Sequence, residues 1–286
     1  MGLKLIKKFK IKTVDLTKDG WEEEVISSFK DTGFAVLTNH GIAKNMIDAS
    51  YSQWKRFFDD EGKFKYLSPE KNKGYFPMKS ENAKGSSVKD LKEFYHVFYP
   101  FDEVPENISD ITTKSLAFKL NEIARNILHK IQPHIPDELA RIQEEPLHKM
   151  VKDSPSTLLR VLHYPPVPED AEEGAIRAAA HEDINLITLL VSASEAGLQV
   201  QDLEGNWIDV EADAGSIIVN VGDMLQEASD GIFKSTTHRV VNPKDNNVSR
   251  YSMPFFVHPK NSSRLSKRYT AGEYLEQRLR ELGIIK

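Results

Sequence analysis

Two histidines and one aspartate form the most informative chemical pattern in this chain. His181 and Asp183 are two residues apart, and His238 follows well downstream. Two imidazoles and a carboxylate typically bind one face of a non-haem Fe(II) ion and leave other positions open. Arg250 and Ser252 are again two residues apart. An arginine suits a carboxylate ligand because its fork binds bidentately and stays charged. The sequence therefore predicts an iron site with a carboxylate-binding pair.

Each part of this pattern is weak when it stands alone. With 43 acidic residues in 286, a histidine followed two residues later by a carboxylate is expected about once among nine histidines. The ordinary alternative is a hydrogen-bonded structural histidine beside a surface aspartate, or an arginine in a surface ion pair. The prediction therefore depends on the combination of residues.

The sequence around these residues is typical of β-strands. Residues 185–191 are apolar and β-branched, and His238 lies in a similar run at 235–241. Residues 250–257 form a third run, rich in aromatic residues. Side chains two apart on an extended chain point to the same face. We therefore expect the first histidine and the aspartate to enter a strand together and to reach one metal from one edge of a sheet.

On these residues and several ordered blocks, the chain resembles the isopenicillin N synthase-like Fe(II)/2-oxoglutarate-dependent oxygenases. The densest blocks are GLQVQDLEGNWIDV at 197–210, GSIIVNVGDMLQ at 215–226, FKSTTHRVV at 233–241 and RYSMPFF at 250–256. TGFAVLTNHGI at 32–42 and KEFYHVF at 92–98 resemble that family's amino-terminal region. The resemblance covers nearly the whole chain.

The resemblance implies a role for individual residues. It makes His181, Asp183 and His238 the ligands of Fe(II), with O₂ at an open position. It implies that the distal carboxylate of the cosubstrate 2-oxoglutarate is bound by Arg250, Ser252 and Tyr164. Candidate substrate contacts lie in regions that face the pocket in relatives, namely Tyr75, Phe94, His96, Arg177 and Phe256. The implied reaction oxidises, and first of all hydroxylates, a C–H bond of a small molecule and releases succinate and CO₂; desaturation and ring formation are other outcomes in the family.

Leu162 departs from the family's pattern, because many relatives carry an asparagine two residues before the tyrosine. The change leaves two possibilities, looser binding of 2-oxoglutarate or replacement by another group such as His163. Two further functions therefore stay open. One is an Fe(II) oxidase of the same fold that does not use 2-oxoglutarate, and the other is a non-catalytic jelly-roll binding protein. A zinc hydrolase is disfavoured, since nothing near the ligands supplies an evident general base.

Composition limits the class of protein and its partners. A net charge of −5 argues against a nucleic-acid partner, and the absence of cysteine excludes disulfides and Cys-zinc sites. The first residues lack the apolar core and cleavage site of a secretory signal, and no apolar run is long enough to cross a bilayer. We expect a cytoplasmic protein with a small-molecule substrate and no membrane partner, and the oligomeric state is left open.

The pattern of the chain changes near residue 155. Before it, apolar residues recur at helical spacing in 21–33, 46–58 and 114–131. After it come short strands with turn signals at 203–206, 214–215 and 222–223, and Thr270 with Glu273 predicts a capping box for a last helix. We expect a mainly β fold with flanking helices around a double-stranded β-helix, or jelly roll. The predicted parts are a mixed region at 1–154, which packs on the core, the oxygenase core at 155–260 and a C-terminal helix at 261–286. We expect the three parts to form one compact unit.

Overall fold

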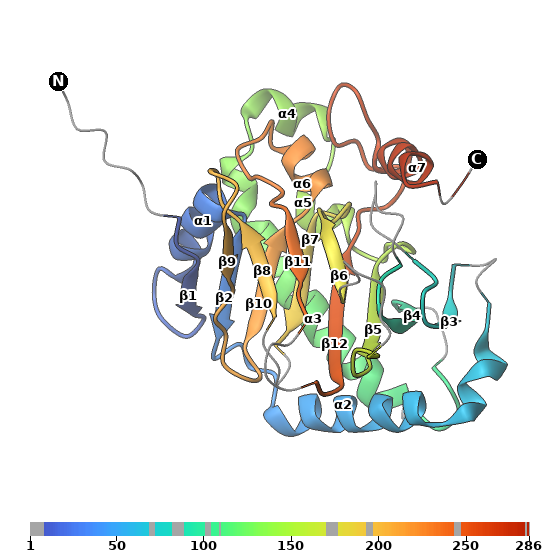
Figure 1. Cartoon of the computed structure of the whole chain (residues 1–286). Helices are drawn as coiled ribbons and strands as arrows, with labels where there is room; N and C mark the ends of the chain where they lie inside the picture. Colours follow the sequence, from blue (N-terminus) through green and yellow to red (C-terminus); the bar gives the residue numbers. More distant parts are fainter. Residues whose placement is uncertain are drawn as a thin grey trace.

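The fold is described from a computed structural model of the 286-residue chain (Figure 1). The structure describes residues 9–68, 72–81, 89–100, 104–108, 110–169, 177–192, 197–242, 247–283 and 285. Among these residues no helix combines the length and the apolar character needed to cross a membrane.

An eight-stranded sheet forms the framework, with strand order β1-β2-β10-β7-β12-β5-β4-β3. Its members are β1 (Lys12–Asp15), β2 (Phe34–Thr38), β3 (Gly74–Phe76), β4 (Glu93–Phe98), β5 (Leu158–Tyr164), β7 (Ile187–Val191), β10 (Ile217–Val221) and β12 (Arg250–Val257). Strand β2 pairs with β10, and β4 pairs with β5, so strands from both sides of residue 155 share this one sheet.

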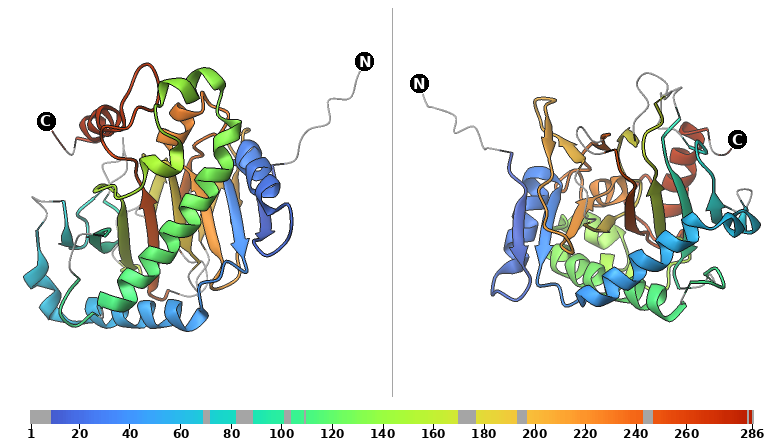
Figure 2. Two further views of the ribbon diagram at one scale, coloured as in Figure 1. Left: turned by 180° about the vertical axis from the view of Figure 1, so that it is seen from behind. Right: turned by 60° about the horizontal axis from the view of Figure 1, so that its bottom comes forward.

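A smaller sheet of four strands lies over one face of the large sheet (Figures 1 and 2). It has the order β6 (Ala178–His181), β11 (His238–Val240), β8 (Leu198–Gln201) and β9 (Trp207–Asp209). An apolar cluster joins the two sheets: Phe34, Val36 and Ile218 of the large sheet pack with Ala178, Leu198, Val200 and Val240 of the small one. This is the double-stranded β-helix that the sequence predicts.

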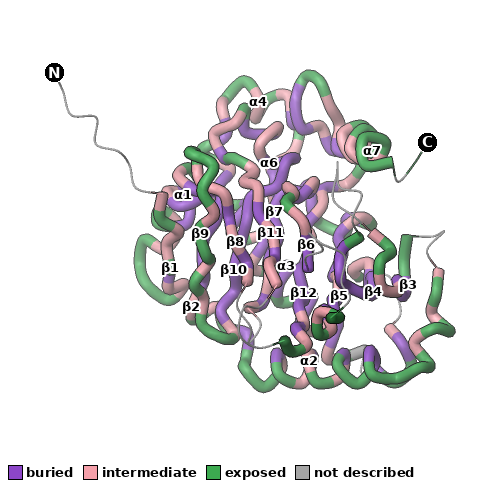
Figure 3. The backbone as a smooth tube through the Cα atoms, viewed as in Figure 1, coloured by how far each residue is buried: buried purple, intermediate pink, exposed green. Residues whose placement is uncertain are grey.

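Helices cover the opposite face of the large sheet. They are α1 (Trp21–Thr32), α2 (Lys44–Asp59) and α3 (Asp110–Ile131), and α5 (Leu147–Met150) packs on α3. Helices α4 (Asp137–Ile142), α6 (Asp223–Ala228) and α7 (Ala271–Glu281) and the 3₁₀ turns Glu61–Tyr66 and Gln132–His134 lie elsewhere. Helix α3 crosses behind the sheet, and its buried Leu120 and Ile127 join the same core cluster as Leu159 and Phe255 (Figures 2 and 3). The three helices predicted before residue 155 are confirmed, and so is the capping box of α7.

The large sheet has two chemically different faces because side chains alternate along each strand. Its outer face packs against the helices and includes Tyr95, Val97, Leu159, Val161, Met253 and Phe255. Its inner face looks toward the small sheet. On that face the register aligns Ser252 with Leu162 and Leu162 with Phe94, one row beyond the paired Arg250 and Tyr164. Thus one set of strands supplies the core and the groups that face the small sheet.

Of two local expectations, one is confirmed and one changes. The predicted hairpin is confirmed as β8 and β9 joined by a tight turn, in which Asp202 caps the backbone of Glu204 and Asn206. Gly222-Asp223, however, begins helix α6 rather than an isolated turn. A Cβ on Gly222 would lie 2.2 Å from the carbonyl oxygen of Asn185, so the close approach of these two segments requires glycine.

Candidate metal centre

His181 and His238 meet because their two strands are neighbours in the small sheet. His181 is the last residue of β6, His238 is the first of β11, and the antiparallel register pairs them directly. Their ring centroids are 4.4 Å apart. Asp183 does not lie in a strand as expected; it follows β6 in the segment where the chain crosses from the small sheet to β7 of the large one. That crossing turns its carboxylate toward both imidazoles.

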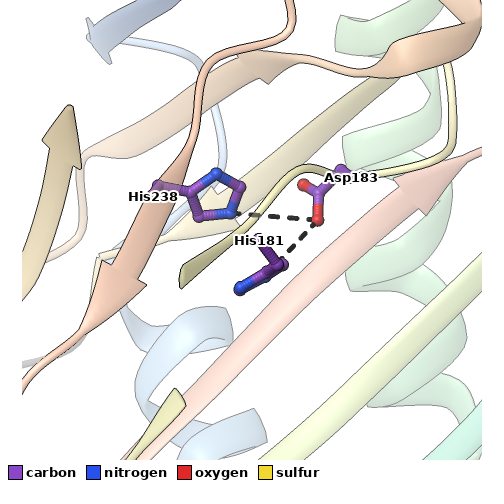
Figure 4. Close-up of side chains that lie close together, drawn as sticks. All are labelled: His181, Asp183 and His238. Carbon is purple, nitrogen blue, oxygen red and sulfur yellow. Dashed lines mark ion pairs between the residues drawn. The ribbon is translucent and has the colours of Figure 1, made fainter. Parts of the chain in front are cut away.

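The three side chains converge on one point (Figure 4). The Nε2 atoms of His181 and His238 each lie 3.8 Å from Oδ1 of Asp183. The three donor atoms all lie within 4.8 Å of one another, and no other group of three such residues in the described parts of the chain does the same. One ion can therefore contact all three side chains.

Backbone hydrogen bonds orient both imidazoles for metal binding. Nδ1 of His181 donates to the carbonyl of Ala179 at 2.7 Å, and Nδ1 of His238 donates to that of Thr236 at 3.0 Å. A carbonyl only accepts, so each Nδ1 carries the proton and each Nε2 presents a lone pair. Burial, and next the neighbouring His238, lower the pKa of His181 to about 4. The ring is consequently neutral near pH 7, the form that binds metals.

Two hydrogen bonds hold the other oxygen of Asp183 away from the imidazoles. Oδ2 accepts from the Thr188 hydroxyl at 2.5 Å and from the Asn220 amide at 2.8 Å. Asn185 donates to the Thr188 oxygen at 2.9 Å, so the Thr188 proton must point to Asp183. Burial alone would raise the pKa of Asp183, but the two histidines and these two donors lower it.

Thr188 and Asn220 hold the metal-ligand candidate Asp183 by hydrogen bonds, and sequence reasoning missed both. They lie opposite each other in the register of β7 and β10. The only available signal was Thr188 in an otherwise apolar strand, and the long-range pairing that makes it useful is not visible in the sequence. With Oδ2 occupied, Asp183 offers a single oxygen beside two imidazole nitrogens. This donor set fits Fe(II), which accepts two histidines and one carboxylate on one face.

The expected carboxylate-binding residues lie together on the inner face of the large sheet. Arg250 pairs with Tyr164 in the register of β12 and β5, and its guanidinium carbon is 5.4 Å from the centre of the Tyr164 ring. Ser252 is two residues further along the same face. All three residues are buried. Thr188 and Asn220, which hold Asp183, belong to the same face, so the guanidinium and the metal-ligand candidates occupy one side of the sheet.

Leu162 occupies the inner face, where it packs with Phe76, Phe94 and Tyr164. His163 alternates to the outer face, where its Nδ1 lies 2.7 Å from Glu93 and its Nε2 lies 3.1 Å from the Ser249 hydroxyl. His163 therefore does not take the place of the asparagine found in relatives, and this possibility from the sequence is wrong. At the position where relatives have the asparagine, this chain has the apolar side chain of Leu162.

The five candidate substrate contacts lie in three different places. Phe94, His96 and Phe256 lie on the inner face by the alternation of β4 and β12. Tyr75 lies on the outer face, where its hydroxyl donates to Glu93 and its ring packs on Phe57. Arg177 is buried just before β6, and its guanidinium donates to the carbonyl of Val248. The structure brings the first three to the side of the metal-ligand candidates and does not bring Tyr75 there.

Comparison with known proteins agrees with this geometry. Residues 155–259 match the 2OG-Fe(II) oxygenase superfamily, and residues 11–114 match the family described as non-haem dioxygenase in morphine synthesis N-terminal. Gibberellin 2-beta-dioxygenase 3 of Arabidopsis thaliana is 30% identical over 273 residues, which cover 90% of this chain and 77% of that protein.

Two solved structures extend the comparison to three dimensions. A crystal structure from Shewanella oneidensis, described as an oxygenase, is 46% identical with a TM-score of 0.85, and the match covers 96% of this chain and all of that one. JOX2, crystallised with 2OG, Fe and JA, is 25% identical with a TM-score of 0.73, covering 90% of this chain and 77% of that one.

Proposed function

We propose, from the premise that this chain belongs to the 2OG-Fe(II) oxygenase superfamily, that His181, Asp183 and His238 bind its Fe(II). We further propose that the distal carboxylate of 2-oxoglutarate is bound by Arg250, Ser252 and Tyr164. The protein is an Fe(II)- and 2-oxoglutarate-dependent dioxygenase that oxidises a C–H bond of a small molecule and releases succinate and CO₂. Its division into an N-terminal region at 1–154, a core at 155–260 and a C-terminal helix is part of the proposal.

The observation that carries the residue assignment is the convergence of three donor atoms within 4.8 Å, each already oriented by a second hydrogen bond. Such outer hydrogen bonds fix the tautomer of a histidine ligand and the direction of a carboxylate. A structural ion pair has no need of two imidazoles whose Nε2 atoms both face a single carboxylate oxygen.

The side chains of this chain divide the work of the reaction. Bound Fe(II) supplies the centre at which O₂ oxidises 2-oxoglutarate and then the substrate. Arg250 receives a carboxylate through two parallel hydrogen bonds and holds it in one orientation, while Ser252 adds a hydroxyl. Leu162, Phe76 and Phe94 keep water from this side of the sheet and strengthen the electrostatic contacts inside.

A small-molecule substrate is favoured over nucleic acid because the net charge of the chain is −5. A cytoplasmic location also remains a prediction from the sequence.

The assignment is tested by succinate formation from 2-oxoglutarate under air, with and without Fe(II). The wild-type protein should form succinate only with Fe(II), whereas His181→Ala and Asp183→Ala should lose nearly all of this activity. Lys44 and Asp48 make an exposed ion pair, so Asp48→Ala is the matched control and should behave like the wild type. Undiminished turnover in either ligand variant would contradict the assignment. An oxidase that does not use 2-oxoglutarate would also bind Fe(II) through these residues. In that case, the Fe(II)-loaded protein would bind 2-oxoglutarate no more tightly than the metal-free protein does.

A further inference from the structure

Four charged side chains form a second polar group on the inner face, which we call the ionic cluster: Glu81, Asp90, Lys92 and Arg160. Asp90 and Lys92 are buried, with side chains 6% and 9% exposed, and Lys92 Nζ lies 2.9 Å from Asp90 Oδ2. Asp90 also accepts from the backbone N–H of Ala179 at 3.2 Å. Ala179 belongs to β6, two residues before His181, so the ionic cluster adjoins the strand that carries a metal-ligand candidate.

Glu81 is held as a bound carboxylate would be held. Its two oxygens accept from NH1 and NH2 of Arg160 at 3.1 and 3.2 Å, and Lys92 Nζ lies 3.3 Å from Oε2. The Arg160 guanidinium carbon lies 4.6 Å from the ring centre of Phe94 and 5.6 Å from that of Phe256. A planar fork, an ammonium group and two phenyl rings together make a site for a carboxylate with an apolar body.

His96 completes one side of this site. Its Nε2 accepts from Nε of Arg160 at 2.8 Å, and its Nδ1 donates to the carbonyl of Asn72 at 3.0 Å. The ring is therefore neutral and directs the guanidinium fork toward Glu81. Arg160 is positioned whether or not Glu81 occupies the fork.

The two acids of the ionic cluster are held differently. Asp90 accepts from both Lys92 and the backbone of β6, and it is nearly inaccessible to solvent. Glu81 lies outside the strands, its side chain is 29% exposed, and its carboxylate contacts are the two cations. Removing Glu81 would leave two cations and one anion on a buried wall, an imbalance that a second carboxylate would correct.

We propose that Glu81 occupies the site for the substrate's own carboxylate, and that the substrate is a small carboxylic acid whose anionic end replaces Glu81 between Arg160 and Lys92. This inference rests on the proposed function, because it takes the inner face as the side from which substrate meets the metal. The guanidinium fork of this site is distinct from the one assigned to 2-oxoglutarate, since Arg160 and the paired Arg250 and Tyr164 lie at different levels of β5. Lys92 interacts electrostatically with Tyr164, so the two sites adjoin at that residue. Phe94 and Phe256 favour an apolar or ring-shaped body next to the carboxylate.

Binding of benzoate to the full-length protein without metal tests the proposal, with benzamide as the uncharged match. Calorimetry is done in an Arg250→Gln background so that the other carboxylate site does not contribute. Benzoate should bind Glu81→Ala at least about tenfold more tightly than the protein with Glu81, because an intramolecular competitor at a high effective concentration has been removed. Glu81→Gln should give a smaller gain, and benzamide should give none.

Two further variants test whether the gain in benzoate affinity depends on the two cations of the ionic cluster. Lys92→Met and Arg160→Gln, each combined with Glu81→Ala, should abolish the gain in benzoate affinity. Glu106→Ala removes a carboxylate from an exposed pair with Lys65 and should leave benzoate binding unchanged. If Glu81→Ala is poorly stable, benzoate should raise its melting temperature more than that of the parent protein, since a ligand that binds only the folded state stabilises it.

The proposal is overturned if benzoate binds Glu81→Ala and the parent equally, if benzamide binds as well as benzoate, or if the gain survives loss of both cations. Failure of the proposed Fe(II) and 2-oxoglutarate assignment would leave these results unchanged, because no metal is present. Conversely, loss of the benzoate effect would leave Fe(II)-dependent succinate formation intact. A comparison of carboxylic acids with their amides in that succinate assay then extends the test to substrates.

Discussion

The two faces of the large sheet each bury a carboxylate, and they treat it in opposite ways. On the outer face, Glu93 satisfies both oxygens: His163 lies 2.7 Å from Oε1, and Tyr75 and Lys63 contact Oε2. Near the inner face, Asp183 has one oxygen bound by Thr188 and Asn220, and the other faces two imidazoles at 3.8 Å. Protein side chains contact both oxygens of Glu93, whereas one oxygen of Asp183 is oriented toward a position where a metal ion can bind.

This difference separates a structural carboxylate from the carboxylate that we assign to metal binding more clearly than burial does. Both side chains are 6% exposed. What differs is whether hydrogen bonds and ion pairs from the protein complete the group. The comparison predicts that changes at Glu93 affect folding, whereas changes at Asp183 affect metal binding.

The largest expected effect follows removal of the inner carboxylate. Asp183→Ala should lower Fe(II)-dependent succinate formation by roughly 10³-fold or more, because two neutral imidazoles alone bind Fe(II) poorly. The free energy of unfolding of the metal-free protein should fall by about 1–3 kcal/mol, because the buried donors of Thr188 and Asn220 lose their acceptor. This loss is smaller than that expected at Glu93, since no charged side chain is left without its partner. Urea unfolding beside the succinate assay checks both. A large loss of stability with unchanged Fe(II) affinity would show that Asp183, like Glu93, serves folding, and would contradict the comparison.

Removal of the outer carboxylate should give the reverse pattern. Glu93→Ala leaves the partly buried Lys63 without its carboxylate partner and removes the acceptor of the Tyr75 hydroxyl, so it should lower the free energy of unfolding by about 3–5 kcal/mol. Urea unfolding followed by circular dichroism measures this loss. Protein that remains folded should bind Fe(II) with wild-type affinity. A stable Glu93→Ala protein with impaired Fe(II) binding would show that the outer network serves the metal site.

Arg250 tests how far the inner face is specialised for carboxylates. Arg250→Gln replaces a charged, bidentate donor with a neutral amide and should weaken binding of 2-oxoglutarate by about 100-fold. Anaerobic calorimetry on the Fe(II)-loaded protein measures this affinity, and Fe(II) binding itself should not change. Equal affinities in the two proteins would remove Arg250 from the cosubstrate site.

The hydrogen bonds to Asp183 should have a smaller effect. Asn220→Ala and Thr188→Val each free Oδ2 to turn, and each should lower Fe(II) affinity by about 10–100-fold, the usual range for residues that orient a ligand. Competition with a chelator of known affinity measures the change. A weaker affinity for 2-oxoglutarate with unchanged Fe(II) affinity would point to a different role.

The smallest effect concerns the dependence of stability on pH. Burial, and next the nearby Arg160, lower the pKa of His96 to about 3 from its ordinary value of 6.5. Between these values the unfolded chain binds one proton more than the folded chain, so stability rises with pH up to about 6.5 and is lost as the pH falls. One such group contributes at most about 1.4 kcal/mol per pH unit. Urea unfolding at pH 4.5, 5.5 and 6.5 should give a shallower slope for His96→Gln than for the wild type, whereas parallel slopes would contradict the prediction.

The sequence predicted the parts of the site that local patterns encode. The spacing of His181 and Asp183 and the strand around His238 led to the three side chains that converge, and the alternation of Arg250 and Ser252 placed both on one face. The helices were predicted because their apolar spacing is local. The capping box of α7 was readable for the same reason.

The remaining features depend on contacts between distant segments. Asp183 was expected in a strand, but the chain crosses between sheets at that point. Strand alternation predicts that Tyr75 and Phe94 lie on opposite faces of the sheet. Which of these two faces is turned toward the small sheet depends on the helices that pack on the other face, and local sequence does not show this. Thr188, Asn220 and Glu81 acquire their partners through register and long-range packing. A polar residue at 188 in an apolar strand was a local signal, but the sequence does not reveal its partner, and Asn220 and Glu81 gave no signal.

Anaerobic titration with Fe(II) followed by 2-oxoglutarate is the most direct test of the shared site. The wild-type protein should bind one equivalent of Fe(II), and the visible absorption band of an iron–2-oxoglutarate complex should appear only after the second addition. Asp183→Ala should bind no Fe(II), and Arg250→Gln should bind Fe(II) but require far more 2-oxoglutarate. Full Fe(II) binding and an unchanged band in Asp183→Ala would place the metal elsewhere and contradict the account.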